Sequence, residues 1–262
     1  MSFSMTYTTP LSSILQGHAQ AIGLMQQQEF ERASHVLDQL LDPHERSYPS
    51  DDTTAQLRVP VPELQRYDVH DSSSQNTKDD FWIYPMALHL QLGHQPFPPS
   101  PTRMMMTLGD LHELISCLIL YNMGLCSHLR SIMNIMTKDK TTKRALSAEQ
   151  RNALGGEALH CYEVALMDYD CWDYARNANN TNSNNAVLTF VQLALHNNAA
   201  SLHARLWGNV DDTVPHSMVQ MSQLLGEWMN NNKTMTCRAM VKVFVDNIYY
   251  NAKLRERPAP MA

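Results

Sequence analysis

The fold is decided by one stretch, residues 111–129, which reads LHELISCLILYNMGLCSHL. Its apolar residues recur every three or four positions, the spacing that places them on one face of an α-helix. Part of this stretch returns 75 residues later, because Tyr121-Asn122-Met123-Gly124 with His128 is matched by His196-Asn197-Asn198-Ala199 with His203. A second helical pattern follows each copy, so the sequence predicts an all-α protein built from helical hairpins.

The same periodicity divides the chain, which we expect to form one domain over residues 1–262. A first hairpin is predicted over 11–43, where Pro43 ends it, a second over 108–175, and a third with a terminal helix over 186–255. Ser147 to Gln150 resembles a capping box that starts the second helix of the second hairpin. A strand is the competing interpretation around Val241 to Val245, where valines alternate.

Residues 44–107 have no sustained helical period and carry Pro, Ser and Asp throughout. We expect an irregular insertion here, because such a length is unusual for a plain loop. Leu57–Val61 and Phe81–Leu90 favour extended structure, and their prolines would confine them to edge strands or a small β-hairpin. The methionine run Met104–Met106 is expected to act as adaptable core packing.

Composition excludes several classes of protein. The chain has a formal net charge of −6, which argues against nucleic-acid binding because phosphates attract an excess of Lys and Arg. It has no uninterrupted apolar run long enough to span a membrane and no secretory leader pattern, so a cytoplasmic or nuclear location without membrane association is expected. The five cysteines lack CxxC spacing and fit small core residues in a reducing compartment.

Catalytic and metal-binding patterns are missing from the sequence. The twelve histidines show no HExxH spacing, and no GxSxG, GxGxxG or GxxxxGK[ST] stretch occurs. Asp168 and Asp170 lie at the end of a predicted helix, where carboxylates are usually solvated. The sequence therefore predicts a non-enzymatic protein with no cofactor and no metal site.

The hairpins resemble tetratricopeptide repeats, in which a small residue of the first helix meets an Ala–aromatic–Ala pattern in the second. Gly124 fits the small position, and Ala158, Tyr162 and Ala165 fit the second helix, with an insertion of about 22 residues between them, roughly 133–154. In the first hairpin the matching residues are Ala21, Phe30, Ala33 and Leu37. The third hairpin keeps Asn197, Ala199 and His203 without a clear Ala–aromatic–Ala pattern.

The chain as a whole is similar to a group of eukaryotic tetratricopeptide-like proteins of uncharacterised function. These share an extended segment like Phe81–Leu88 and a small-residue tail like Pro258–Ala262. The resemblance implies an α-solenoid whose concave face is lined by first helices and binds a protein or peptide, as a helix or an extended segment. The contacts that it implies are Tyr121, Asn122, Leu125, His128, His196, Asn197, Ala200 and His203.

Other interpretations of these residues stay open. An Asn on an apolar helix face can bind a neighbouring backbone group within the core, and His128 and His203 can be packed structural histidines. The chain could instead be a structural subunit of a larger assembly or, less favoured, a hydrolase with dispersed residues. Lys and Arg are missing from the expected groove, so recognition of a C-terminal carboxylate, common in the family, is not expected.

Overall fold

The computed structural model describes residues 11–41, 55–58, 84, 87–88, 91–92, 103–106, 108–132, 146–178, 186–207, 213–231 and 244–249. It divides into two compact units. Unit 1 comprises Met1–Pro60 and Ala87–Ser183, and unit 2 comprises Val61–Met86 and Asn184–Ala262. The described residues form six helices, α1 to α6, and a further short helix at 244–249. For the described residues, the prediction of an all-α protein is confirmed.

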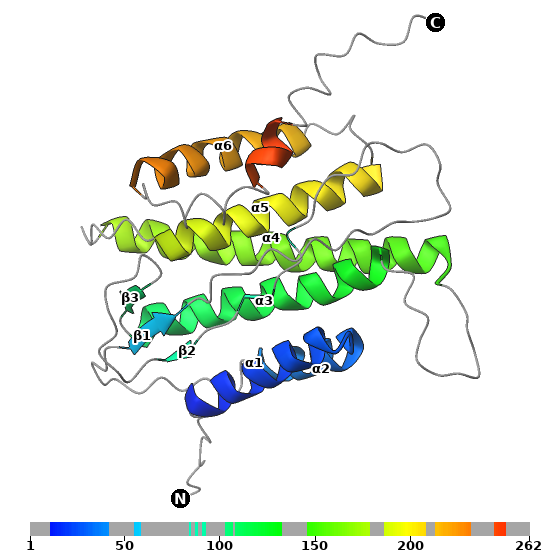
Figure 1. The fold of residues 1–262 in the computed structure, drawn as a ribbon, viewed down its shortest axis with the longest axis horizontal. Helices are drawn as coiled ribbons and strands as arrows, with labels where there is room; N and C mark the ends of the chain where they lie inside the picture. The colour runs from blue at the N-terminus through cyan, green and yellow to red at the C-terminus, as the bar shows by residue number, and fades with distance from the viewer. Residues whose placement is uncertain are drawn as a thin grey trace, which may run out of the picture. The chain divides into compact units, whose positions relative to one another are not determined.

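Unit 1 contains four helices in two pairs (Figure 1). These are α1 (Leu11–Gln26), α2 (Phe30–Leu40), α3 (Leu108–Ile132) and α4 (Ala148–Ala178). Each helix packs against the next one along the chain. The apolar faces predicted from the spacing are buried, including Ala21, Phe30, Ala33 and Leu37 of the first pair. Residues 133–145 of the expected insertion lie outside the described part of the chain, and α4 begins at Ala148.

The turn between α1 and α2 is a Schellman motif built on a non-glycine residue. Gln28 has a φ of 61°, in the left-handed region. Its N–H donates to the carbonyl of Met25 at 2.9 Å, and the N–H of Glu29 donates to the carbonyl of Leu24 at 2.9 Å. These bonds satisfy carbonyls that the end of α1 leaves without helical partners. Gly usually occupies this position, so Gln28 carries a conformational cost.

The capping box predicted at the start of α4 is confirmed. Ser147 Oγ accepts a hydrogen bond from the N–H of Gln150 at 3.1 Å, and Gln150 Oε1 accepts one from the N–H of Ser147 at 2.9 Å. The carbonyl of Ser147 also accepts the N–H of Arg151 at 3.0 Å. Two N–H groups that the first helical turn would leave unsatisfied are therefore bonded reciprocally.

Helices α3 and α4 approach closely at Gly124, as the small residue there predicted. A Cβ atom at Gly124 would lie 2.7 Å from Cε1 of Tyr162 and 3.1 Å from the carbonyl oxygen of Ala158. Tyr162 is fully buried, and its ring contacts Tyr121 at a centroid distance of 6.0 Å. The absence of a side chain at Gly124 is what allows the ring to lie against the α3 backbone.

A small sheet also belongs to unit 1. It has three antiparallel strands in the order β2 (Gln91–Leu92), β1 (Ala55–Arg58) and β3 (Arg103–Met106). Leu57 pairs with Leu92 on one side and with Met104 on the other. Extended structure, predicted for Leu57–Val61 in an edge strand or a small hairpin, is found at Leu57 and Arg58, while 59–61 lie outside the described residues. The edge position is not found, because β1 is the central strand. The methionine run, expected to act as core packing, forms β3.

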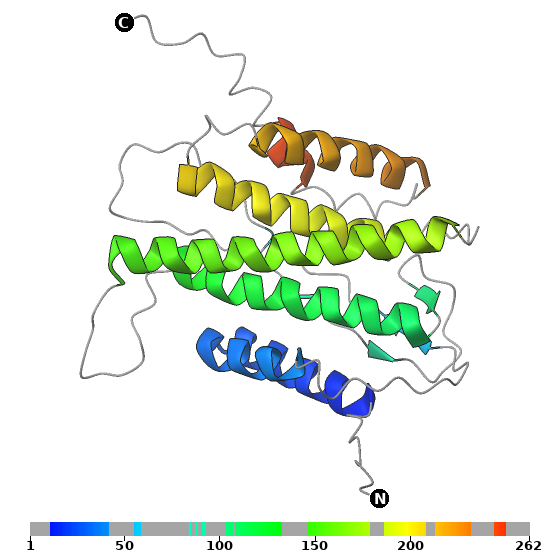
Figure 2. The same ribbon diagram turned by 180° about the vertical axis from the view of Figure 1, so that it is seen from behind.

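Unit 2 contains α5 (Ala186–Trp207), α6 (Thr213–Asn231) and the helix at 244–249. Figure 2 shows α5 and α6 side by side, and they pack against each other. Pro215 lies in the first turn of α6, where a missing N–H costs nothing. Of the segment around Val241 to Val245, where a strand was the competing interpretation, only residues 244 and 245 are described, and both lie in the helix at 244–249. Residues 232–243 lie outside the described part.

Candidate functional site

Four predicted contact residues lie on α3, and all four are fully buried. They are Tyr121, Asn122, Leu125 and His128, each with no exposed surface. Long-range packing places an amide, a phenol and an imidazole in the interior of unit 1, where polar groups require partners. Their hydrogen bonds therefore determine what they can do.

Asn122 binds the backbone of Leu88 with both ends of its amide. Its Oδ1 accepts the N–H of Leu88 at 3.0 Å, and its Nδ2 donates to the carbonyl of Leu88 at 2.9 Å. Nδ2 also lies 2.9 Å from Nε2 of His18 on α1. Because Leu88 fixes the amide orientation, Nε2 of His18 must act as the acceptor, which makes this histidine neutral with its proton on Nδ1.

An amide that bonds the N–H and the C=O of one residue recognises extended main chain. In a strand these two groups point to the same side, whereas in a helix they point in opposite directions along the axis. The Asn side chain thus takes the place of a neighbouring strand. We call this pair of hydrogen bonds an amide clamp.

Two of the α3 residues interact with Tyr162 of α4. The Tyr162 hydroxyl lies 3.4 Å from Nδ1 of His128, and the two rings meet edge to face with centroids 6.1 Å apart. Tyr121 lies against the same ring. These contacts join α3 to α4, so both residues have a structural role in unit 1.

A second amide clamp lies on α5 in unit 2. Oδ1 of Asn198 accepts the N–H of Tyr84 at 2.8 Å, and its Nδ2 donates to the carbonyl of Tyr84 at 3.0 Å. Asn197 supports this clamp, since its Nδ2 donates to Oδ1 of Asn198 at 3.2 Å. Asn247, from the helix at 244–249, in turn donates to Oδ1 of Asn197 at 2.5 Å. Three buried amides are therefore connected behind the clamped residue.

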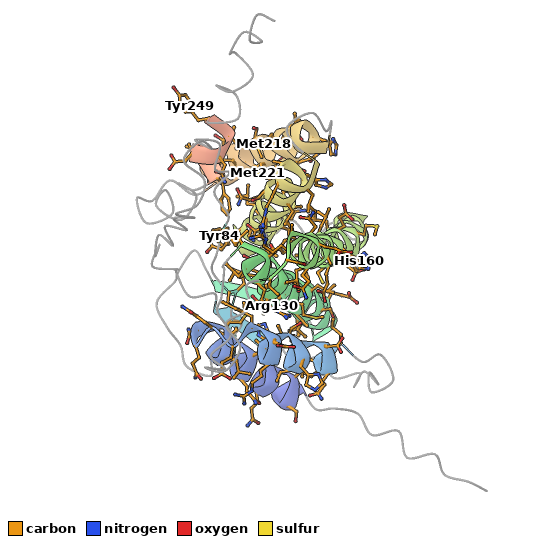
Figure 3. All side chains as sticks on the ribbon, turned by 90° about the vertical axis from the view of Figure 1, so that its right-hand side faces the viewer. Tyr84, Arg130, His160, Met218, Met221 and Tyr249 are labelled. Carbon is orange, nitrogen blue, oxygen red and sulfur yellow. The ribbon has the colours of Figure 1, made fainter. Side chains whose placement is uncertain are left out.

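The side chain of Tyr84 is held by two phenylalanines of unit 2. Its ring lies 5.4 Å from that of Phe190 at an interplanar angle of 82°, and 5.4 Å from that of Phe244 at 39°. Edge-to-face and tilted contacts of this kind are the favoured geometries of aromatic pairs. Tyr84 is fully buried, and burial raises the pKa of its hydroxyl far above the ordinary value. Figure 3 labels Tyr84 at the side of α5.

The other α5 residues of the predicted site differ in burial. Ala200 is fully buried, whereas His196 and His203 are half-buried. Burial, together with the neighbouring His216 of α6, lowers the pKa of His196 to about 4. His196 is therefore neutral at physiological pH, since neither cause favours its charged form.

The two copies of the sequence pattern are aligned one residue away from the residues that make equivalent hydrogen bonds. This alignment pairs Asn122 with Asn197, but the residue that makes the equivalent two hydrogen bonds is Asn198. The clamped residues Tyr84 and Leu88 were predicted only as part of an extended segment. Asn247 gave no sequence signal, because an isolated Asn carries no periodic pattern.

The other titratable groups that the structure describes include three buried cysteines. Cys117, Cys126 and Cys161 are buried free thiols, as predicted, and burial raises their pKa values to about 12, 12 and 11. Protonated thiols are poor nucleophiles. Among the described residues, no three His, Cys, Asp or Glu side chains lie close enough together to hold a metal ion.

Two further findings bear on identity. In the described part of the chain, every helix is too short or too polar to cross a membrane. Comparison with protein-family models, with curated proteins and with solved structures gives no match for this chain.

Proposed function

We propose that this chain is a non-catalytic protein-interaction module that binds extended polypeptide through buried asparagines on α3 and α5. The observation that supports this proposal is the pair of amide clamps, in which Asn122 bonds the backbone of Leu88 and Asn198 bonds that of Tyr84. In both cases the bound residue lies outside any helix or strand. The protein thus carries out on its own chain the type of recognition expected for a partner.

Main-chain recognition suits a peptide-binding protein for a physical reason. Every residue except proline offers the same N–H and C=O, so two hydrogen bonds per clamp tolerate many sequences. Each bond contributes about 0.5–1.5 kcal/mol net, while leaving a buried partner unsatisfied costs about 1–3 kcal/mol. A bound segment must therefore be extended at the clamped residue.

The finer architecture belongs to the same proposal. The Gly124 crossing and the buried Ala33 and Ala158 are consistent with tetratricopeptide-like hairpins, in which first helices line a concave binding face. Asn122 lies on the first helix of its hairpin, α3, and Asn198 on the first helix of its hairpin, α5. This placement is the one that a solenoid would use for ligand contacts.

A structural role in a larger assembly is the second candidate. Unit 2 exposes several large apolar side chains, of which Tyr249 is 69% and Val219 is 54% exposed. Tyr249 points away from the helix that carries it (Figure 3). Apolar surface of this kind is often covered by another subunit.

The proposal can be tested by selecting decapeptides from a displayed library on the immobilised full chain. Selected peptides should bind the wild type and lose about tenfold or more in affinity on Asn122→Ala or Asn198→Ala, because each change removes both bonds of one clamp. Asn152→Ala and Asn230→Ala are matched controls, since these asparagines are exposed on α4 and α6. Circular dichroism would verify that each variant is folded.

Hydrogen exchange on the wild type gives a readout that needs no variant. If a selected peptide takes a clamp, the amide of Leu88 or Tyr84 loses its acceptor and should exchange faster. Peptides that bind equally well to all four variants and leave both amides protected would contradict the proposal. A failure to select any peptide would favour the structural-subunit candidate.

A further inference from the structure

Unit 2 holds Tyr84 as a binding protein would hold a ligand. The contacts come from Phe190 and Asn198 on α5 and from Phe244 on the helix at 244–249, which together we call the Tyr84 site. Asn198 lies 114 residues beyond Tyr84 in the sequence. The segment that carries Tyr84 and the helices that receive it are thus separate parts of the chain, brought together only by folding.

One part of the Tyr84 site binds the main chain of the anchor residue, and another part binds its side chain. Asn198 supplies the first, through its two hydrogen bonds of 2.8 and 3.0 Å. Phe190 and Phe244 supply the second, and their own rings lie 5.7 Å apart. An aromatic anchor fits this arrangement, since ring pairs contribute about 0.5–1.5 kcal/mol beyond the area that they bury.

The clamp is rigid because other amides support it. Asn197 donates to Oδ1 of Asn198, and Asn247 donates to Oδ1 of Asn197. All three side chains are fully buried. A site whose recognition groups are fixed before binding loses little conformational freedom on binding, which favours affinity.

We propose that the Tyr84 site is a receptor for an extended partner peptide with an aromatic anchor, and that the chain's own Tyr84 is its internal competitor. This inference rests on the proposed function and specifies its ligand. The anchor residue cannot be proline, because Asn198 Oδ1 needs its N–H. A partner must also compete with a segment of the same chain, whose covalent connection gives it a high effective concentration.

Fluorescence anisotropy with a labelled peptide tests this directly. The probe is the octapeptide of residues 79–86, which reads DDFWIYPM and contains the clamped tyrosine. Tyr84→Ala in the full chain removes the aromatic anchor of the competitor and leaves only its main chain, so it should strengthen binding of this peptide at least about tenfold over the wild type. Tyr249→Ala is the matched control, since this tyrosine is exposed in the same unit, and it should bind like the wild type.

Two further pairs of peptide and protein variants test which groups bind the peptide. The same peptide with Tyr84→Ala should bind the Tyr84→Ala chain at least about tenfold more weakly, because it lacks the anchor. Adding Asn198→Ala to the Tyr84→Ala chain should weaken binding of the original peptide by a similar factor. Both losses of affinity together would support binding of the peptide at the Tyr84 site.

The outcomes separate this inference from the proposed function. If the peptides with and without the tyrosine bind equally and both depend on Asn198, the aromatic site is overturned while main-chain recognition stands. If neither peptide binds a folded Tyr84→Ala chain, the inference is overturned and the proposed function loses its unit 2 clamp. If Tyr84→Ala fails to fold, recovery of its helical circular dichroism by the original peptide alone supports the inference, and no recovery overturns it.

Discussion

The close approach of α3 and α4 at Gly124 makes a quantitative prediction about Gly124→Ala. A Cβ there would lie 2.7 Å from Cε1 and 3.0 Å from Cδ1 of Tyr162. Carbon atoms normally approach to about 3.5–4.0 Å, so the ring would have to move by about 0.8 Å or more. Tyr162 is buried and contacts Tyr121 and His128, which leaves it little freedom to move.

Gly156→Ala is the matched control for this substitution. It lies in the same unit, within α4, and a Cβ at Gly156 would meet no atom within 4 Å. Both substitutions gain about 0.5–1 kcal/mol from helix propensity, whereas only Gly124→Ala bears an overpacking cost of about 1–3 kcal/mol. The free energy of unfolding should therefore be about 1–3 kcal/mol lower for Gly124→Ala than for Gly156→Ala.

Urea denaturation followed by circular dichroism measures this difference. A Tyr162→Leu background removes the nearest contact atoms, so Gly124→Ala should lose most of its cost there. Equal stabilisation by both alanines in the wild-type background would refute the reasoning, because it would mean that the helices have room for a methyl group at the crossing.

Three other predictions concern helix ends and pH. Ser147→Ala should lower the free energy of unfolding by about 1 kcal/mol in the same urea assay, because it removes the acceptor for the Gln150 N–H; an unchanged midpoint would contradict this. Gln28→Gly should raise the free energy of unfolding by about 1 kcal/mol, because the left-handed φ of 61° costs Gly nothing. A lower urea midpoint would contradict this prediction. His196 has a pKa of about 4 in the folded chain, from burial and then from His216, against 6.5 for an ordinary histidine. Because the unfolded chain therefore binds the proton more tightly, the free energy of unfolding should have its full value above about pH 6.5 and fall by up to about 3 kcal/mol towards pH 4. Thermal melts of His196→Gln should not show this contribution to the loss of stability at low pH.

The sequence predicted the elements that depend on neighbours in the chain. Helices α1 to α6 follow the apolar spacing, and the capping box at Ser147 involves residues three apart. Helical hydrogen bonds join residues four apart, so local pattern and local structure coincide. The contact of Gly124 with Tyr162 was also predictable, because the resemblance to a known hairpin paired the two helices.

The sheet could be predicted only in part. Extended structure near Leu57 was expected, but β1 pairs with strands that begin more than thirty residues later, at Gln91 and Arg103. Alternation within a short strand does not identify its partners, and the methionines of β3 show no alternation at all. Which strands pair across such a separation depends on the tertiary packing of unit 1.

For the candidate site, the sequence by itself determined the residue types and the helices that carry them. Asn122 on α3 and Asn197 on α5 were expected to contact an extended peptide. Only the tertiary structure decided which amide does so, that Asn198 rather than Asn197 makes the clamp, and that the bound residues are Tyr84 and Leu88 of the same chain. The physical reason is that an amide's partner depends on its orientation and on residues brought in from 34 and 114 positions away, which no local spacing records.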